Sequence, residues 1–322
     1  MLQIYDRSVT FIPPGNAAYL MGDFTDWDEA PLPITGPITF EFPPGAYVEY
    51  AFLDANKQPI ADPSNSQVPK NPWYAYHRAF TLPENRFVEP PRPHIFRGSL
   101  NEHVMASEVF GSQRRYYVYE PPVSPVATLY VQDGEAFYSK LRFHEVAEAL
   151  IERNVIQQVR LVMIEPQDRK AEYWFNEGYE AFLLQELLPA IERSYGAATI
   201  QGLWGASLGG LVSIWLAWRN PQVFARVASQ SGCFTASPGG GNPYHDPEWL
   251  TEQMRQTARR DLRLFVETGQ IEWLLAPNRR FAAMLAEKGY LHSYQEWPGG
   301  HNWTTWEQGL APGLLYLFSI TE

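Results

Sequence analysis

The sequence predicts a small all-β domain over residues 1–88, followed by a larger α/β domain over residues 98–322 with a mostly parallel sheet and helices on both faces. Three observations predict this. Short apolar runs broken by turn residues fill the first part. Strands alternate with helices in the second part. A G-x-S-x-G pattern stands at one strand-to-helix junction. The proline-rich segment 89–97 separates the two parts, and we interpret it as a stiff linker.

Composition limits the possible functions. The chain has 322 residues and a net charge of −11, which argues against nucleic-acid binding and offers no attraction for anionic lipids. Cys233 is the single cysteine, so no intrachain disulfide is possible, and we expect it to be a small buried residue. Because no signal peptide and no apolar run of roughly 18 residues is visible, we expect a soluble, cytoplasmic protein with no membrane partner. The oligomeric state stays open.

The first part contains β-type runs at residues 17–21, 37–42 and 47–53, punctuated by Pro-Pro-Gly and Asp-Ala-Asn turns. Regular spacing of such runs predicts a small sandwich. The stretch Gly-Asp-Phe-Thr-Asp-Trp-Asp at 22–28 resembles immunoglobulin-like early-set modules, including glycogen-binding ones. Three interpretations of Trp27 follow: it stacks on a sugar, fills the core, or faces the catalytic domain.

The second part begins with an antiparallel strand pair, 103–110 and 114–120, joined by a Gly-Ser turn. Alternating elements then follow: strands at 127–132, 159–165, 199–204, 226–230, 262–268 and 292–297, and helices at 143–153, 179–195, after 207, 278–288 and from about 303. Sites in such sheets lie at the carboxyl ends of the strands. The glycine- and proline-rich segment 233–249 has no following P-loop lysine, so we expect an irregular loop or cap over the site.

The candidate nucleophile is Ser207, within Gly205-Ala206-Ser207-Leu208-Gly209 between an apolar strand and a buried helix. This is the setting of a nucleophile elbow, in which a sharp turn exposes the serine hydroxyl above the sheet. The glycines on either side leave room for the strand and helix to approach. The helix behind the serine directs its free N–H groups at a developing oxyanion.

A serine nucleophile needs a base and an acid that orients the base. His301 follows the last strand in a Pro-Gly-Gly turn, where the base is expected, whereas His292 begins that strand at its other end. Glu272, in the loop after the preceding strand, is favoured as the acid over Glu267, which lies within the strand. The order Ser207, Glu272, His301 is the one found in α/β-hydrolases.

The oxyanion hole is expected to use backbone N–H groups. One is that of Leu208, directly after the nucleophile, and the other comes from the loop after strand 127–132, near Gly134. No residue cluster indicates a metal site, and the expected chemistry needs neither a metal nor an organic cofactor.

Several segments together resemble a known family: 131–135 (VQDGE), 186–189 (ELLP), 205–211 (GASLGGL), 229–232 (SQSG), 267–272 (ETGQIE) and 299–303 (GGHNW), with a weaker match at 60–65 (IADPSN). They resemble the putative-esterase family of α/β-hydrolases, and within it the enterochelin esterases. The resemblance implies cleavage of the ester bonds of a catecholate siderophore's triserine lactone, releasing iron inside the cell, with iron entering only as part of the substrate.

The same resemblance implies Ser207 as nucleophile, His301 as base and Glu272 as acid. It also places Arg169 at a family arginine, which suggests a contact to an anionic substrate; an ordinary solvated arginine is the alternative. Two other functions stay open. One is a feruloyl or acetyl esterase acting on polysaccharides, and the other is a non-catalytic sugar- or partner-binding module on a hydrolase scaffold.

Overall fold

The computed structural model describes residues 1–27, 29–71, 73–242 and 247–320. The chain divides into two compact units. The first unit combines Met1–Glu89 with two short stretches from far along the sequence, Thr268–Leu275 and Glu296–Gln308; the second unit comprises Pro90–Glu267, Ala276–Gln295 and Gly309–Glu322. The linker expected at residues 89–97 stays a prediction.

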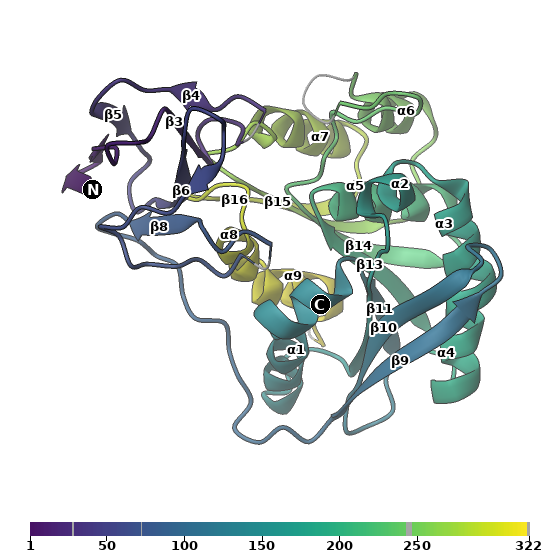
Figure 1. Ribbon diagram of the computed structural model, residues 1–322. Coiled ribbons are helices and arrows are strands. Elements are labelled where there is room, and N and C mark those ends of the chain that lie inside the picture. The colour runs from purple at the N-terminus through teal and green to yellow at the C-terminus, as the bar shows by residue number, and fades with distance from the viewer. Residues whose placement is uncertain (28, 72, 243–246, 321–322) are drawn as a thin grey trace. The chain divides into compact units, whose positions relative to one another are not determined.

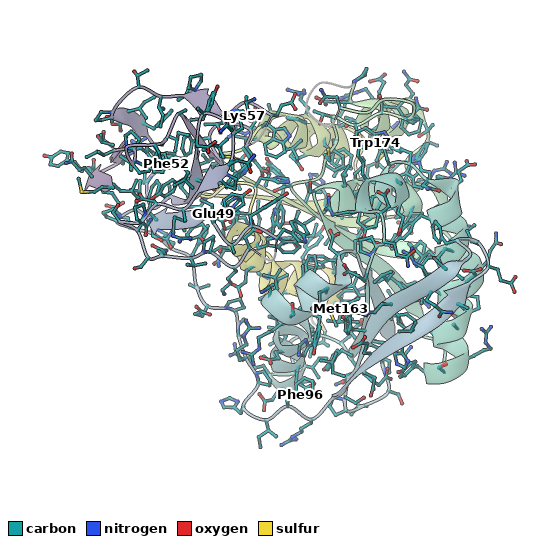
Figure 2. All side chains as sticks on the ribbon, in the orientation of Figure 1. Glu49, Phe52, Lys57, Phe96, Met163 and Trp174 are labelled. Atoms are coloured by element: carbon teal, nitrogen blue, oxygen red, sulfur yellow. The ribbon has the colours of Figure 1, made fainter. Side chains whose placement is uncertain are left out.

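Two antiparallel sheets form the N-terminal part of the first unit (Figure 1). One contains β1 (Leu2–Tyr5), β2 (Ser8–Phe11) and β5 (Ile38–Glu41); the other is centred on β6 (Tyr47–Leu53) and also contains β3 (Tyr19–Gly22), β4 (Leu32–Pro33), β7 (Pro59–Ile60) and β8 (Arg78–Thr81). Apolar residues from both sheets, including Phe11, Tyr50 and Phe52, pack edge to face in one core (Figure 2 labels Phe52). The predicted all-β N-terminal part is therefore confirmed.

An eight-stranded, mostly parallel sheet runs through the rest of the chain. Its strands are β9 (Ser99–Ser107), β10 (Ser112–Glu120), β11 (Ala127–Val131), β12 (Val159–Ile164), β13 (Ile200–Ala206), β14 (Phe224–Gln230), β15 (Arg263–Gly269) and β16 (Leu291–Trp297), in the order β16-β15-β14-β13-β11-β12-β10-β9. β9 and β10 form the predicted antiparallel pair, and β12, β11, β13, β14 and β15 run parallel. β11 and β12 are buried along their whole length, as Met163 in β12 illustrates (Figure 2), because helices cover a parallel sheet.

Helices lie on both faces of this sheet (Figure 1). The helices among the described residues are α1 (Phe143–Glu152), α2 (Arg169–Tyr173), α3 (Glu177–Ala181), α4 (Leu188–Tyr195), α5 (Leu208–Arg219), α6 (Trp249–Gln256), α7 (Leu275–Glu287), α8 (Trp303–Gln308, in the first unit) and α9 (Leu310–Phe318), with π-helical turns η1 (Ala136–Lys140) and η2 (Phe182–Leu187). α1 packs on α9, and α2 packs on α5. This α/β architecture agrees with the predicted fold class.

Some predicted boundaries need correction. The helix expected over 179–195 is a run of α3, η2 and α4, and α2, α6 and η1 were not expected. Part of the irregular loop expected at 233–249 lies outside the described residues, at 243–246; its other residues up to α6 form turns and irregular structure. Cys233 is buried, as expected. No helix among the described residues has the length and apolar character to cross a membrane.

Replacing Glu49 with glutamine is expected to flatten the pH dependence of stability. Glu49 is completely buried in β6, and its burial raises its pKa to about 8. The folded state therefore keeps a proton that the unfolded state releases, so this contribution is full below about pH 4.5 and falls by up to about 1.4 kcal/mol per unit as the pH rises to 8. Urea unfolding of both proteins at several pH values measures the difference in ΔG.

The matched control for this experiment is Glu41→Gln, at an exposed position of β5. His77, whose Nδ1 lies 3.5 Å from Glu49 Oε2, also titrates, and burial lowers its pKa to about 4. Its own contribution to stability changes only below about pH 6.5, so the slopes of the two proteins are compared between about pH 6.5 and 8. Parallel stability profiles for wild type and Glu49→Gln would contradict the prediction.

Candidate active site

Ser207 occupies a strained turn in the second unit. β13 ends at Ala206 and α5 begins at Leu208, and the serine between them has φ 58° and ψ −121°, a conformation that non-glycine residues rarely adopt. Its N–H donates to the carbonyl of Gln230 at 2.8 Å, and its own carbonyl accepts from the N–H groups of Leu211 at 3.0 Å and Cys233 at 3.1 Å. The first turn of α5 and the segment at the end of β14 thus hold this turn in place, as a nucleophile elbow requires.

The glycines around Ser207 are needed for close packing. A Cβ at Gly205 would lie 2.3 Å from the backbone carbon and oxygen of Gly209, and a Cβ at Gly210 would lie 2.5 Å from Ser229 Oγ. Gly209 itself packs against the end of β11, where its Cβ would meet Gln132 and Asp133 at 3.1 Å. Any side chain at Gly205 would therefore force the strand and the helix apart.

The two predicted oxyanion donors lie at ends of regular elements. Leu208 is the first residue of α5, so its N–H has no partner within the helix. Gly134 follows β11 and lies so close to β12 that a Cβ would come within 2.6 Å of the backbone of Met163. Only glycine fits so close to the backbone of β12. The sequence predicted Gly134 from its position after the strand alone, without this packing. The catalytic role of both N–H groups stays a prediction.

Arg169, at the start of α2, connects the two backbone segments that carry these donors. Its Nε donates to Asp133 Oδ1 at 2.7 Å, and its Nη2 donates to Asp133 Oδ2 at 3.0 Å and to the carbonyl of Ala206 at 3.0 Å. Asp133 is buried, with φ 56°. Arg169 is therefore held in a bidentate ion pair and is not simply a solvated side chain. Sequence reasoning did not identify Asp133 as its partner, although Asp133 directly follows a strand at its carboxyl end.

His301 and Glu272 form a hydrogen-bonded pair in the first unit. His301 lies in the base loop, residues 298–302 between β16 and α8, and Glu272 in the acid loop, residues 270–274 between β15 and α7. Nδ1 of His301 and Oε2 of Glu272 share the hydrogen bond, while Oε1 of Glu272 accepts from Thr268 Oγ1 at 2.6 Å and from the Gly269 N–H at 2.7 Å. The carboxylate is completely buried and the imidazole is 11% exposed.

Two indole rings confine the imidazole. The ring centres of Trp273 and Trp306 lie 4.5 and 4.9 Å from that of His301. Such packing restricts rotation of the imidazole and excludes water from its faces. Neither tryptophan was identified from the sequence, although each is within five positions of a predicted site residue.

The alternative acid and base candidates lie elsewhere. Glu267 is buried within β15, where it accepts from Gln230 Nε2 and packs against Gly309. His292 is near the start of β16, with Nδ1 3.0 Å from the carbonyl of Tyr290. The structure thus brings His301 together with Glu272.

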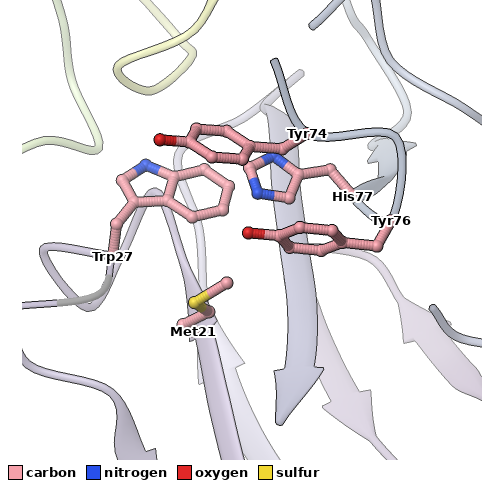
Figure 3. A pocket seen from close by; sticks show the side chains of 5 residues that line it. All are labelled: Met21, Trp27, Tyr74, Tyr76 and His77. Carbon is pink, nitrogen blue, oxygen red and sulfur yellow. The ribbon is translucent and has the colours of Figure 1, made fainter. Parts of the chain in front are cut away.

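Trp27 lies in an aromatic pocket of the second N-terminal sheet (Figure 3). Its indole stacks on the imidazole of His77 with ring centres 4.3 Å apart, and Tyr74 also stacks on that imidazole at 5.1 Å. Met21 and Tyr76 complete the lining of a cavity of about 80 Å³. The indole packs on the small cluster of Met21, Ala51 and Leu53 and not on the main sandwich core. A sugar contact stays a prediction.

The family model described as Putative esterase matches residues 107–317. The chain is 26% identical over 279 residues to the Iron(III) enterobactin esterase of Escherichia coli K12, covering 81% of this chain and 68% of that protein. It is also 26% identical over 162 residues to Bacillus subtilis YbbA, covering 43% of this chain and 62% of YbbA, which is less than two thirds of that relative's length.

Solved structures share the fold. The enterochelin esterase of Shigella flexneri superposes with a TM-score of 0.76 at 22% identity, covering 98% of this chain and 94% of that one. A ferulic acid esterase superposes with a TM-score of 0.61 at 18% identity, covering 70% of this chain and 98% of that one. At these identities the similarity shows the fold alone.

Proposed function

We propose that this chain, which belongs to the Putative esterase family, is a cytoplasmic serine esterase that hydrolyses carboxylic esters through Ser207, His301 and Glu272. The observation that carries the proposal is the buried hydrogen-bonded pair of His301 and Glu272, a base with its orienting carboxylate. The strained turn at Ser207 supplies the complementary feature, a serine directly ahead of a helix N-terminus.

The topology of the sheet supports this combination. β13, β14 and β15 run parallel. Ser207 follows β13 directly, and the acid loop follows β15. The carboxyl ends of parallel strands meet at one edge of a sheet, so the connections that follow β13 and β15 are expected to begin at the same edge. The proposed combination of Ser207 with Glu272 requires this.

In the proposed mechanism Ser207 Oγ attacks the ester carbonyl while His301 takes the hydroxyl proton. The N–H groups of Leu208 and Gly134 stabilise the tetrahedral oxyanion. When the intermediate collapses, the C–O bond of the ester breaks and His301 gives its proton to the departing alcohol. A water molecule, deprotonated by His301, then attacks the acyl-enzyme; the bond between the acyl carbon and Ser207 Oγ breaks, His301 returns the proton to Oγ, and the acid is released. Glu272 stabilises the imidazolium in both halves of the reaction, and no metal or organic cofactor takes part.

The proposed substrate is the triserine lactone of a catecholate siderophore, with iron as part of the substrate. Similarity to the Iron(III) enterobactin esterase over 81% of the chain supports this choice. A feruloyl or acetyl esterase acting on polysaccharides is the second candidate, supported by the shared fold of a ferulic acid esterase.

Two experiments test these proposals. A fluorophosphonate probe is expected to form a covalent adduct on Ser207, located by peptide mass spectrometry; folded protein without an adduct would instead indicate a binding module on a hydrolase scaffold. Initial rates on a ferric catecholate trilactone and on a feruloylated arabinoxylan fragment are then compared. Faster hydrolysis of the second would reverse the substrate assignment.

Replacing Arg169 with alanine is expected to lower both stability and activity. The change leaves the buried carboxylate of Asp133 without its bidentate partner, which costs about 3–5 kcal/mol for a buried pair and less here because the Arg169 side chain is 27% exposed. If Arg169 also binds an anionic substrate, KM for an anionic ester will rise at least about tenfold more than KM for a neutral ester. Urea unfolding and paired kinetics measure both effects; equal KM changes would contradict substrate binding. Arg142→Ala, at an exposed ion pair with Glu145, is the control.

A further inference from the structure

The base loop is hydrogen-bonded to the N-terminal sheet within the first unit. The N–H of Tyr47, the first residue of β6, donates to the carbonyl of Pro298 at 2.9 Å. The side-chain amide of Asn302, directly after His301, donates to Asp23 Oδ2 at 2.9 Å. Thr304 Oγ1, at the start of α8, donates to Tyr47 Oη at 3.1 Å. Bonds to the sheet therefore lie on both sides of His301.

Asp23 lies at the centre of these contacts. It follows β3, it is 1% exposed, and its N–H donates to the carbonyl of Glu49 at 3.1 Å. Its Oδ2 accepts from the Glu49 N–H at 2.7 Å as well as from Asn302. A Cβ at Gly300 would lie 2.0 Å from Asp23 Cγ. The carboxyl group therefore packs directly against the residue before His301 and bonds to the residue after it.

The side chain of Asn302 links Asp23 to the first turn of α8. Its amide Nδ2 faces Asp23, and its Oδ1 accepts from the N–H of Thr305 at 2.9 Å and from Thr305 Oγ1 at 3.0 Å. This is the pattern of a side chain that caps the first turn of a helix. The orientation of the amide is therefore fixed at both of its ends.

The acid loop is attached to the same structure. Gln270 N–H donates to the carbonyl of Trp297 at 2.8 Å, and Ile271 N–H donates to that of Gly299 at 3.0 Å. The side chain of Ile271 packs in the core of the N-terminal sheets. The two partners of the His301–Glu272 hydrogen bond are therefore both held by segments that contact the N-terminal sheets.

The protonation state of Asp23 is compatible with its contacts to the base loop. Burial raises its pKa well above the usual range, and the facing carboxyl groups of Glu49 from β6 and Glu272 from the acid loop raise it further. A neutral carboxyl group at this position accepts the two hydrogen bonds without competing with Glu272 for the proton on His301.

We propose that Asp23 is a positioning residue for His301: through Asn302 and Gly300 it fixes the base loop against the N-terminal sheet. This inference rests on the proposed function, since it takes His301 as the base. Proton transfer in a serine esterase depends on placement to within about 1 Å, and a displacement of that size costs about 100-fold in rate. The N-terminal part of the chain thereby contributes to the rate of the chemical step.

The test is a double-mutant cycle across the hydrogen bond between Asp23 and Asn302. Asp23→Ala and Asn302→Ala are each expected to lower kcat about 10- to 100-fold with KM changed less than about threefold. The double variant Asp23→Ala, Asn302→Ala is expected to have a kcat within about threefold of the more impaired single variant, because the two side chains act through one hydrogen bond. In each protein, proton NMR follows the downfield resonance of the hydrogen shared by His301 and Glu272, which should be lost or shifted in both single variants and in the double variant.

Asp62→Ala is the control, because Asp62 is a buried carboxylate of the same sheets that bonds to Tyr50 and Ser64 and not to the base loop. It is expected to leave kcat and the resonance unchanged. Unaltered kcat in Asp23→Ala or Asn302→Ala, or losses of kcat that multiply in the double variant, would overturn the role of Asp23. An inactive wild type without a fluorophosphonate adduct would overturn the proposed function instead, while the NMR comparison would still test Asp23.

Discussion

Replacing Ser207 with alanine is expected to lower kcat by about 10⁶-fold, leaving the residual acceleration of about 10³-fold over water that binding and oxyanion donors supply in triad enzymes. The change removes the attacking oxygen and little else. Ser207 makes its three backbone bonds through its N–H and carbonyl, so alanine can keep the same turn at a similar backbone strain. Initial rates on a chromogenic ester and the fluorophosphonate adduct measure the effect.

Ser213→Ala is the matched control for this experiment. Ser213 is buried in the same helix, α5, where its hydroxyl donates to the carbonyl of Gly209 at 2.7 Å. Loss of such a bond is expected to cost about 1 kcal/mol of stability and to leave kcat within several-fold of wild type. A Ser207→Ala protein that kept more than about 1% of wild-type kcat would contradict the assignment of the nucleophile.

Replacing Glu272 with glutamine is expected to lower kcat by about 10³- to 10⁴-fold. Two donors, Thr268 Oγ1 and the Gly269 N–H, hold one carboxylate oxygen. The glutamine oxygen will take that position, which turns the amide nitrogen toward Nδ1 of His301. A neutral imidazole facing an N–H donor carries its own proton on Nε2, and cannot then accept the serine proton there.

Kinetics of Glu267→Gln decide between the two acid candidates. Glu267 lies in the same strand region, but its hydrogen bond is to Gln230. Its replacement is expected to reduce stability and to leave kcat within about tenfold of wild type, because the His301–Glu272 pair remains. A larger loss of kcat in Glu267→Gln than in Glu272→Gln would reverse the choice of acid.

The α/β half of the chain was the more predictable one because its signals are local. Each buried parallel strand is a short apolar run, and the elbow at 205–209 is defined by adjacent glycines. α6 was missed because its sequence, WLTEQMRQ, has few apolar residues and only Leu250, Thr251 and Met254 are buried. β1 and β2 were missed although they form a hairpin with a two-residue turn, in which Asp6 has φ 55°.

Only those residues of the candidate site that directly follow a strand in the sequence could be predicted. His301 and Glu272 each follow a strand of the same sheet, so their proximity could be expected. Asp23 could not be placed, since it bonds to a residue 279 positions away and nothing in its neighbourhood distinguishes it from other turn aspartates. The ion pair between Arg169 and Asp133 was similarly hidden, because it depends on how two loops meet in space.

The first unit is assembled from stretches that lie far apart in the sequence, which affects folding during synthesis. Residues 1–89 leave the ribosome before Thr268–Leu275 and Glu296–Gln308, which emerge only after residues 90–267 have been made. At about 5–20 residues per second, roughly ten seconds or more separate these events. During that interval the N-terminal sheets lack Ile271 from their core, and Asp23 lacks the hydrogen bond from Asn302. Until Ile271 emerges, the nascent chain exposes apolar surface that this residue covers in the folded protein, and that period is when the chain most needs protection from aggregation.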